Sequence, residues 1–288
     1  MESFDEPGCH VWSGEPRPIS KEVPRGRPLL DPSEQHRDFY TAVEDEHGYL
    51  LRFFARCDVR LTADLGSATH HRAPDADDGF IDVLLAGTFL AFLTALNGNC
   101  VLHASAVEVD GRGLAFVGHS GMGKSTLALA TCAAGARLIA EDVLVVTTEG
   151  SVRCLPGNTD IRLRKGSVAL LDRMPEAERI VTPDGRDGVR PPLSGADPVP
   201  LQALVVPRPS RKAAELTVER MPPVNALFRL MNFPRLNGFI DPGVVRRQFH
   251  GTGAIARHVP VFVATVPWGP PFRLDLGDEL LEVLDREG

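Results

Sequence analysis

Hydrophobic and polar positions follow different patterns in three successive parts of the chain. Residues 1–38 are rich in Pro, Gly, Glu and Arg and have little apolar periodicity, which predicts a mostly irregular arm. Residues 39–100 carry short strand-like segments and one long apolar run, which predicts a small α+β portion. Residues 101–288 alternate between strand-like and helix-like segments. This alternation predicts an α/β domain with a mixed sheet.

The long apolar run of the second part covers residues 80–96 and predicts a buried helix. Two strand-like segments and a polar loop precede it, at 48–56, 58–63 and 70–79. The run has about 17 residues before Asn97-Gly98 and carries Asp82 near its start, so it is marginal for crossing a bilayer. A helix in the core of a soluble protein is the preferred interpretation.

The third part opens with a predicted hairpin that leads into a glycine-rich segment. Residues 101–109 alternate like a strand, an Asp-Gly-Arg-Gly turn signal follows, and 114–117 return as an apolar strand. A helix-like run covers 125–134, and the Pro- and Gly-rich segment 173–200 predicts a long surface excursion. The other predicted elements are two strands within 137–146, strands at 201–206, 214–220 and 260–266, and helices at 222–232, 241–259 and 277–287.

The glycine-rich segment satisfies the phosphate-loop pattern G-x-x-x-x-G-K-[ST] and lies between a predicted strand and a predicted helix, as that pattern requires. Glycines at 118, 121 and 123 allow positive φ, so that backbone N–H groups can turn toward phosphate oxygens. A lysine serves the outer phosphates and a serine hydroxyl is the usual Mg²⁺ ligand. The residues expected at the nucleotide are Gly118, Ser120, Gly121, Met122, Gly123, Lys124, Ser125 and Thr126.

A phosphate loop alone predicts a bound nucleotide, but it does not predict which reaction the protein carries out. A guanine-nucleotide switch would carry an N-K-x-D motif, which is absent from the sequence. A transporter-type ATPase would have its signature loop followed by an apolar strand that ends in Asp. The segment "LSGAD" at 193–197 echoes that loop, but the strand after it ends without a carboxylate. A phosphoryl transferase remains, with Glu141 and Asp142 as its acidic pair.

The run "LHASAVEVDGRGLAFVGHSGMGKSTLALATCAAGARLIAEDVLVV", residues 102–146, resembles the catalytic domain of the HPr kinase/phosphorylase family, which is related to phosphoenolpyruvate carboxykinases. The match includes the histidine that starts the hairpin strand, His103, the phosphate loop, and the acidic pair. Glu141 stands where the family has Asp. The family's "EIRG" element is missing, with "DIRL" at 160–163 as a remnant, so the substrate HPr and the phosphorylase reaction are not supported.

The resemblance implies an α/β fold with a P-loop kinase core, ATP and Mg²⁺ as cofactors, and transfer to a hydroxyl. The chain looks most like the shorter HPr-kinase-like proteins that phosphorylate a serine at the C-terminus of a lasso-peptide precursor. Glu141 is expected to act as the base, Asp142 and Ser125 to hold the metal, and His103 to orient the acidic pair or the acceptor. Arg235, Arg246, Arg247, Asp160 and Arg162 are weaker candidates for phosphate or metal contacts. A nucleotide-binding regulator and a kinase of a small hydroxylated metabolite are the alternatives.

Composition and net charge narrow the expected binding partners and the expected cellular compartment. The 288 residues carry a net charge of −7, which argues against nucleic acid or an anionic membrane as a partner. The five cysteines are scattered and odd in number, which is typical of reduced thiols in a cytoplasmic protein. We therefore expect a cytoplasmic enzyme whose partner is a peptide or small-molecule acceptor, with a homo-oligomer as a further possibility.

Overall fold

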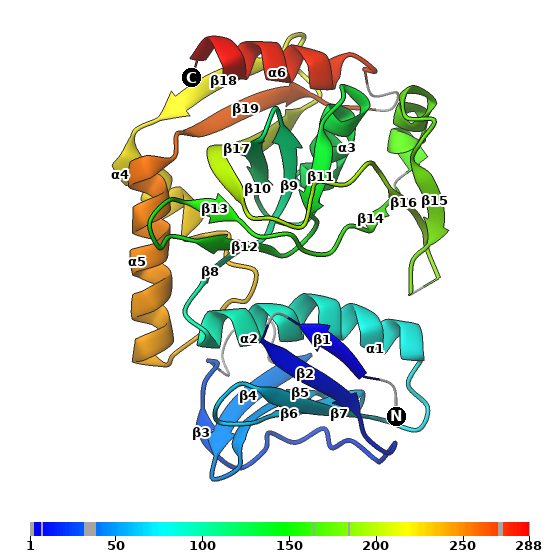
Figure 1. The fold of residues 1–288 in the computed structure, drawn as a ribbon, viewed down its shortest axis with the longest axis vertical. Helices are drawn as coiled ribbons and strands as arrows, with labels where there is room; N and C mark the ends of the chain where they lie inside the picture. The colour runs from blue at the N-terminus through cyan, green and yellow to red at the C-terminus, as the bar shows by residue number, and fades with distance from the viewer. Residues whose placement is uncertain are drawn as a thin grey trace. The chain divides into compact units, whose positions relative to one another are not determined.

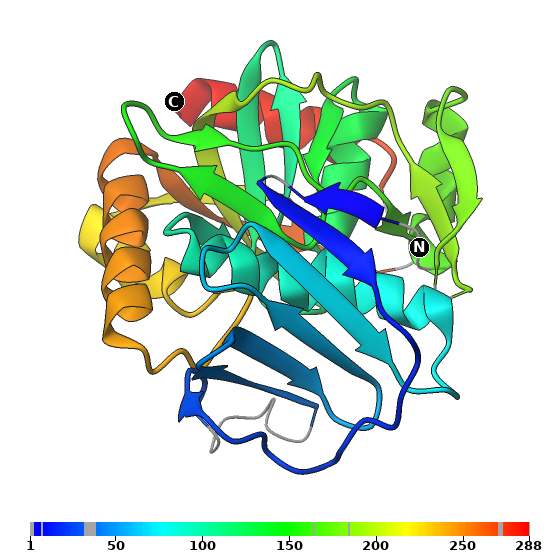
Figure 2. The same ribbon diagram turned by 60° about the horizontal axis from the view of Figure 1, so that its bottom comes forward.

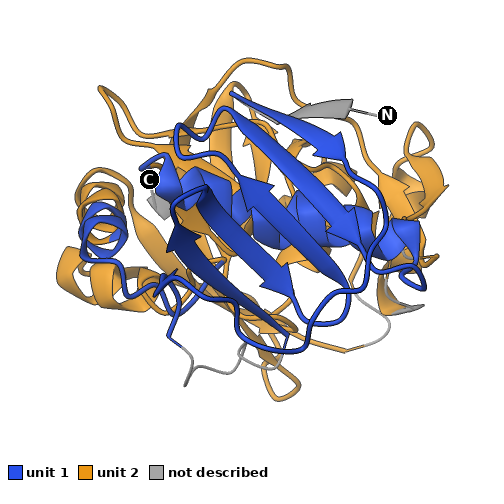
Figure 3. Cartoon of the chain, turned by 90° about the horizontal axis from the view of Figure 1, so that it is seen from below, with its two compact units in different colours: residues 1–98, 236–248 blue, residues 99–235, 249–288 orange. Residues whose placement is uncertain are grey.

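The computed structural model describes residues 3–6, 8–31, 39–163, 165–183, 185–269 and 273–287, and its ribbon is drawn in Figure 1. The chain forms two compact units, coloured separately in Figure 3. Residues 1–98 and 236–248 form the first unit, and residues 99–235 and 249–288 form the second. The first boundary is close to the one expected from sequence, whereas the return of 236–248 to the first unit was not foreseen.

The first unit is built on a seven-stranded sheet, counted over the described residues, in the order β1-β2-β7-β6-β5-β4-β3. Only the β2–β7 pair among these is parallel. Figure 2 shows this sheet with the long helix along one face. The strands are β1 (Ser3–Glu6), β2 (Cys9–Ser13), β3 (Arg27–Pro28), β4 (Tyr40–Asp45), β5 (Gly48–Phe53), β6 (Cys57–Leu61) and β7 (Ser67–Arg72).

Two sequence expectations for this unit are corrected. Residues 1–38 were expected to be irregular, yet β1, β2 and β3 lie there and join the sheet, while residues 32–38 are outside the described part. These strands have only four, five and two residues, which is too short for a periodic pattern to stand out, and β2 also pairs with β7 far along the chain. The predicted loop 70–79 begins inside β7, which runs to Arg72.

The long apolar run forms the predicted helix, in three continuous pieces: α1 (Asp78–Leu84), a π-helical turn η2 (Leu85–Phe89) and α2 (Leu90–Leu96). Asp77 caps it by accepting a hydrogen bond from the Phe80 amide. Phe92 packs edge-on against Tyr49, with ring centroids 6.4 Å apart. By length and composition the helix could cross a membrane, as core helices of soluble proteins also can, and 61% of its most apolar window is buried.

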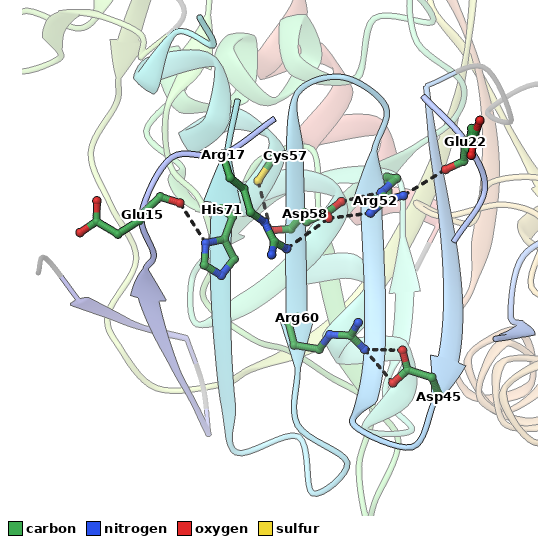
Figure 4. Close-up of polar contacts among 9 residues, drawn as sticks. All are labelled: Glu15, Arg17, Glu22, Asp45, Arg52, Cys57, Asp58, Arg60 and His71. Atoms are coloured by element: carbon green, nitrogen blue, oxygen red, sulfur yellow. Dashed lines mark hydrogen bonds and ion pairs between the residues drawn. The ribbon is translucent and has the colours of Figure 1, made fainter. Parts of the chain in front are cut away.

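A buried ion pair holds the middle of this sheet together (Figure 4). The carboxylate of Asp58, on β6, accepts two hydrogen bonds from Arg52 on β5, at 2.7 and 2.8 Å. Arg17 adds a third, longer contact of 3.4 Å. The Asp58 side chain is only 3% exposed. Its charge is therefore balanced by arginines rather than by water.

We expect Asp58→Ala to destabilise the protein by about 3–5 kcal/mol, because it leaves the Arg52 guanidinium buried without its counter-charge. Asp45→Ala is the matched control. Asp45 also accepts from an arginine, Arg60 at 2.8 Å, but both side chains of that pair are partly exposed. Its loss is expected to cost no more than about 1 kcal/mol. Denaturant unfolding of the two variants measures the difference, and equal effects would contradict the role given to burial.

The second unit contains a nine-stranded mixed sheet, again counted over the described residues. Its elements are β8 (Cys100–Leu102), β9 (Ala104–Val109), β10 (Arg112–Val117), α3 (Lys124–Ala133), β11 (Arg137–Ala140), β12 (Leu144–Thr147), β13 (Arg153–Cys154), β17 (Val199–Ser210), β18 (Thr217–Met221), α4 (Pro223–Leu230), α5 (Pro242–His258), β19 (Val261–Pro267) and α6 (Leu276–Glu287). The boundary between the units falls inside α5.

Three neighbouring strands of this sheet, β10, β17 and β19, run parallel to one another. β9 and β10 form the predicted hairpin, whose turn residues Asp110 and Gly111 both have positive φ. One apolar core includes residues of α3 and α6, and the other includes residues of α4 and α5. α3 and α6 pack so closely that a Cβ at Gly277 would lie 2.0 Å from the Ala130 carbonyl oxygen. The parallel strands all point their carboxyl ends to one edge, where ligands of open α/β sheets bind.

The segment 173–200 is more regular than the sequence predicted. A 3₁₀ helix, η3 (Lys165–Arg173), leads into it, and β15 (Glu178–Val181) and β16 (Asp187–Arg190) pair antiparallel within it. β14 (Ile161–Arg162) pairs with β16 and completes a three-stranded sheet. The sequence predicted a long surface excursion and did not reveal these short strands, because Pro and Gly dominate the segment and mark its turns.

Candidate functional site

The glycine-rich loop lies between β10 and α3, as predicted. Gly121 and Gly123 have φ of 85° and 91°, so both use the left-handed conformation that glycine permits. Gly123 is the N-cap of α3, and no side-chain hydrogen bond caps this end of the helix. The expectation of positive φ does not hold for Gly118, where instead a Cβ would come within 3.0 Å of the Met122 sulfur.

Two side chains of the loop are oriented by hydrogen bonds. Lys124 is 6% exposed and donates from Nζ to the His119 carbonyl oxygen at 3.1 Å. Ser125 donates from Oγ to Oε1 of Glu141 at 2.5 Å. This second bond joins the loop to the acidic pair, which follows β11. The predicted lysine, serine and first acid are therefore brought together.

Glu141 is buried, with 8% of its surface exposed. Its Oε2 atom has no hydrogen-bond partner among the described residues, and neither has the nearby Ser105 hydroxyl. Burial raises the pKa of Glu141 to about 7, and the hydroxyls of Ser105 and Ser125 offset only part of that rise. The Ser105 hydroxyl thus lowers the pKa of Glu141 without forming a hydrogen bond to it. A buried carboxylate oxygen without a partner is poised to receive a cation or a proton.

Asp142 has a different environment from its neighbour. Its φ of 68° places it in the left-handed region, which turns its side chain toward another set of residues. His103 Nε2 lies 3.1 Å from Oδ1, and Arg235 donates to Oδ2 from Nε at 3.1 Å and from Nη2 at 2.9 Å. Burial opposes ionisation, but the hydrogen bond from His103 and the charge of Arg235 hold the pKa of Asp142 well below its ordinary value.

His103 connects the segments that form the site. It lies in the break between β8 and β9, where its N–H donates to the Phe233 carbonyl at 2.9 Å. Its own carbonyl accepts from the Gly118 amide at 3.3 Å. Burial lowers the pKa of His103, while the hydrogen bond to Asp142 raises it in part. The backbone of one residue thus ties the start of the loop to the segment that carries Arg235.

Arg235 is a residue of the site that could not be singled out from the sequence. It was one weak candidate among several arginines, and it lies 93 residues from the carboxylate that it contacts. Asp160, the other weak acidic candidate, is engaged instead by Arg190 at 2.8 Å. Arg246 and Arg247 belong to the first unit, and Arg247 donates to the Leu96 carbonyl there.

The site fits Mg²⁺ together with a nucleotide rather than a metal held by protein alone. No group of three or more His, Cys, Asp or Glu side chains suited to a metal occurs in the part of the chain described. Mg²⁺ bound with phosphates needs only one or two protein carboxylates, with water and phosphate oxygens as its other ligands. The Ser125 hydroxyl and the unpartnered Oε2 of Glu141 supply two oxygen ligands for such an ion.

Glu141 should also make stability depend on pH. Its pKa is about 7 in the folded state against a usual 4.5, so the folded state holds more protons between these values. Stability must then fall as pH rises from about 4.5 to about 7. Glu141→Gln removes this loss, so without nucleotide or metal it should be more stable than the parent at pH 8, by up to about 3 kcal/mol, and similar at pH 4.5. Thermal unfolding at both pH values tests this.

The exposed Glu149→Gln serves as the control for the pH experiment, since it removes one carboxylate from the same unit without changing the buried site. It should show no such difference between the two pH values. A Glu141→Gln variant that follows the parent at both pH values would contradict the effect assigned to burial.

Two comparisons with known proteins found similar chains. No family model matches the chain. The HPr kinase/phosphorylase of Chloroherpeton thalassium (strain ATCC 35110 / GB-78) is 39% identical over 59 residues, which are 20% of this chain and 17% of that protein. The Hpr(Ser) kinase/phosphatase from Coxiella burnetii aligns with 65% of this chain and 90% of its own, at 16% identity and a TM-score of 0.35.

The local sequence match confirms the resemblance to HPr kinase/phosphorylase that the motifs indicated. The match is short, and the chain spans only 17% of that relative's length. The reaction, the nucleotide and the acceptor are matters for proposal.

Proposed function

We propose that this protein is an ATP-dependent kinase that transfers the γ-phosphoryl group to a serine hydroxyl on a peptide. The C-terminal serine of a lasso-peptide precursor is the first acceptor to test. The observation that carries the proposal is the hydrogen bond between Ser125 and Glu141, which couples a phosphate loop to an acidic pair. A loop that only bound nucleotide would have no need for the adjoining cluster of His103, Asp142 and Arg235.

The triphosphate of ATP is held by the amides of the loop and the first turn of α3, with Lys124 as the mobile positive charge. Ser125 and Glu141 would hold Mg²⁺, which would neutralise charge on the phosphate oxygens. The ion would also favour the ionised form of Glu141, whose pKa is raised in its absence. This explains why a carboxylate without a second partner is retained in a buried position.

Asp142 is better placed than Glu141 to meet the acceptor. Its side chain is 41% exposed, whereas Glu141 is buried behind the loop serine. His103 and Arg235 fix its orientation from two sides. The geometry therefore favours Glu141 on the metal side and Asp142 at the hydroxyl, the reverse of the order that the sequence suggested.

In the transfer step the serine oxygen forms a bond to the γ-phosphorus as the bond from that phosphorus to the β,γ-bridging oxygen breaks. ADP leaves with that bridging oxygen, and the hydroxyl proton passes to Asp142, directly or through one water. Arg235 contributes positive charge beside the carboxylate, so that it can stabilise negative charge on the transferred group.

The test is incubation with γ-labelled ATP, Mg²⁺ and a panel of serine-bearing peptides, including peptides that end in serine. Label appearing on a peptide, and absent with Lys124→Ala, is the expected result. ATP binding without transfer to any acceptor would favour the nucleotide-binding regulator. Transfer to a small hydroxylated metabolite and to no peptide would keep the kinase chemistry and change the acceptor.

We further propose that the protein acts in the cytoplasm without nucleic-acid or membrane partners. Light scattering would test whether it forms a homo-oligomer.

A further inference from the structure

Trp268 lies against the phosphate loop, although the two are far apart in the sequence. A Cβ built on Gly123 would come within 2.3 Å of Cη2 of the Trp268 ring, and within 3.0 Å of two more ring atoms. The six-membered ring of the indole therefore covers the α-carbon of the last loop glycine. Gly123 has two reasons to be glycine, its positive φ and this ring.

The parallel strands explain how the indole reaches the loop. β10 pairs with β17 only as far as Phe116 and Val205, whereas β17 and β19 continue together to Ser210 and Pro267. The Trp268 amide then donates to the Ser210 carbonyl at 3.0 Å, which extends the pairing by one more residue. Trp268 thus projects beyond the carboxyl end of β10, at the edge where the loop begins.

The indole is half-buried and packs in part against the apolar core that includes Phe116 and Leu127. In the proposed complex the loop holds the phosphates through its backbone amides and Lys124. Neither of these binds the nucleoside. An aromatic face beside Gly123 offers the apolar, planar surface that a nucleobase requires.

We propose that Trp268 is a positioning residue that stacks against the base of the bound nucleotide. The inference rests on the proposed nucleotide-dependent function. Stacking recognises the π-face of a base and not its hydrogen-bonding edge, so Trp268 would serve adenine and guanine alike. It would fix the nucleoside end while the loop fixes the phosphates.

The experiment compares ATP with inorganic tripolyphosphate, which fills the loop but has no base. Trp268→Leu should weaken ATP binding by about tenfold and change tripolyphosphate binding by less than about twofold, as measured by calorimetry with Mg²⁺. Trp268→Phe, which keeps an aromatic face, should retain most of the ATP affinity. Equal losses for both ligands would mean that Trp268 only supports the loop, and an unchanged ATP affinity would overturn the proposal.

A second measurement leaves Trp268 in place. The chain has two tryptophans, Trp12 and Trp268, so Trp12→Phe leaves the indole at the loop as the single tryptophan. ATP should change its fluorescence and tripolyphosphate should not. A parent protein that binds neither ligand would overturn the nucleotide-dependent function together with this inference. ATP binding that changes the Trp268 fluorescence but leads to no transfer would contradict the kinase proposal and leave this inference standing.

Discussion

Lys124→Ala is expected to lower ATP turnover by at least about 100-fold while the fold is unchanged. The ammonium group lies at the loop, 3.1 Å from the His119 carbonyl oxygen, and is 6% exposed. It is the point charge available to the outer phosphates, and loss of one preorganised charge of this kind typically costs that much in rate. Binding of ATP by calorimetry and its hydrolysis or transfer with labelled ATP measure the effect.

Two controls accompany the Lys124→Ala experiment. Lys212→Ala removes an exposed lysine from the turn after β17 and should leave turnover unchanged. Thermal unfolding should show that Lys124→Ala remains folded, since its charge serves a ligand rather than the apolar core. Turnover at the parental rate in a folded Lys124→Ala protein would exclude the loop as the active site.

The loop and the acidic pair could be predicted because their signals are local. Gly118 through Ser125 form one continuous pattern between a strand and a helix, and such patterns depend on few distant contacts. Glu141 and Asp142 follow within a short distance and end a strand that the alternation marks. The helix at 80–96 and the helix at 241–259, at whose start Asp241 accepts from the Val244 amide at 2.9 Å, were predictable for the same reason.

Residues brought in from elsewhere in the chain could not be predicted in this way. Arg235 and Trp268 reach the site from the segment after α4 and from the end of β19, and nothing in their own neighbourhoods distinguishes them from structural residues. The position of Trp268 depends on the register of β10, β17 and β19, and that of Arg235 on the backbone bond between His103 and Phe233, and no local pattern encodes either. The same holds for the place of β2 in the sheet, which depends on its pairing with β7 more than fifty residues along the chain.

The acidic pair should separate into two phenotypes when each member is neutralised. Glu141→Gln keeps the acceptor for Ser125 but removes an anionic metal ligand, so its activity should fall and recover in part as Mg²⁺ is raised. Asp142→Asn keeps acceptors for His103 and Arg235 but cannot take the proton at neutral pH. Its transfer rate should drop by about 100- to 10,000-fold at saturating Mg²⁺, with ATP binding preserved.

The metal dependence decides between the two possible orders of these residues. Initial rates over a range of Mg²⁺ concentrations, at saturating ATP and acceptor, are measured for both variants and the parent. Rescue of Asp142→Asn by metal, with none for Glu141→Gln, would restore the order suggested by the sequence, with Glu141 as base. Full activity in both variants would remove the pair from the mechanism and leave the phosphate loop without a transfer site. The proposed order holds only if the residue bonded to Ser125 is the one that metal rescues, because that serine is the metal ligand proposed for the loop.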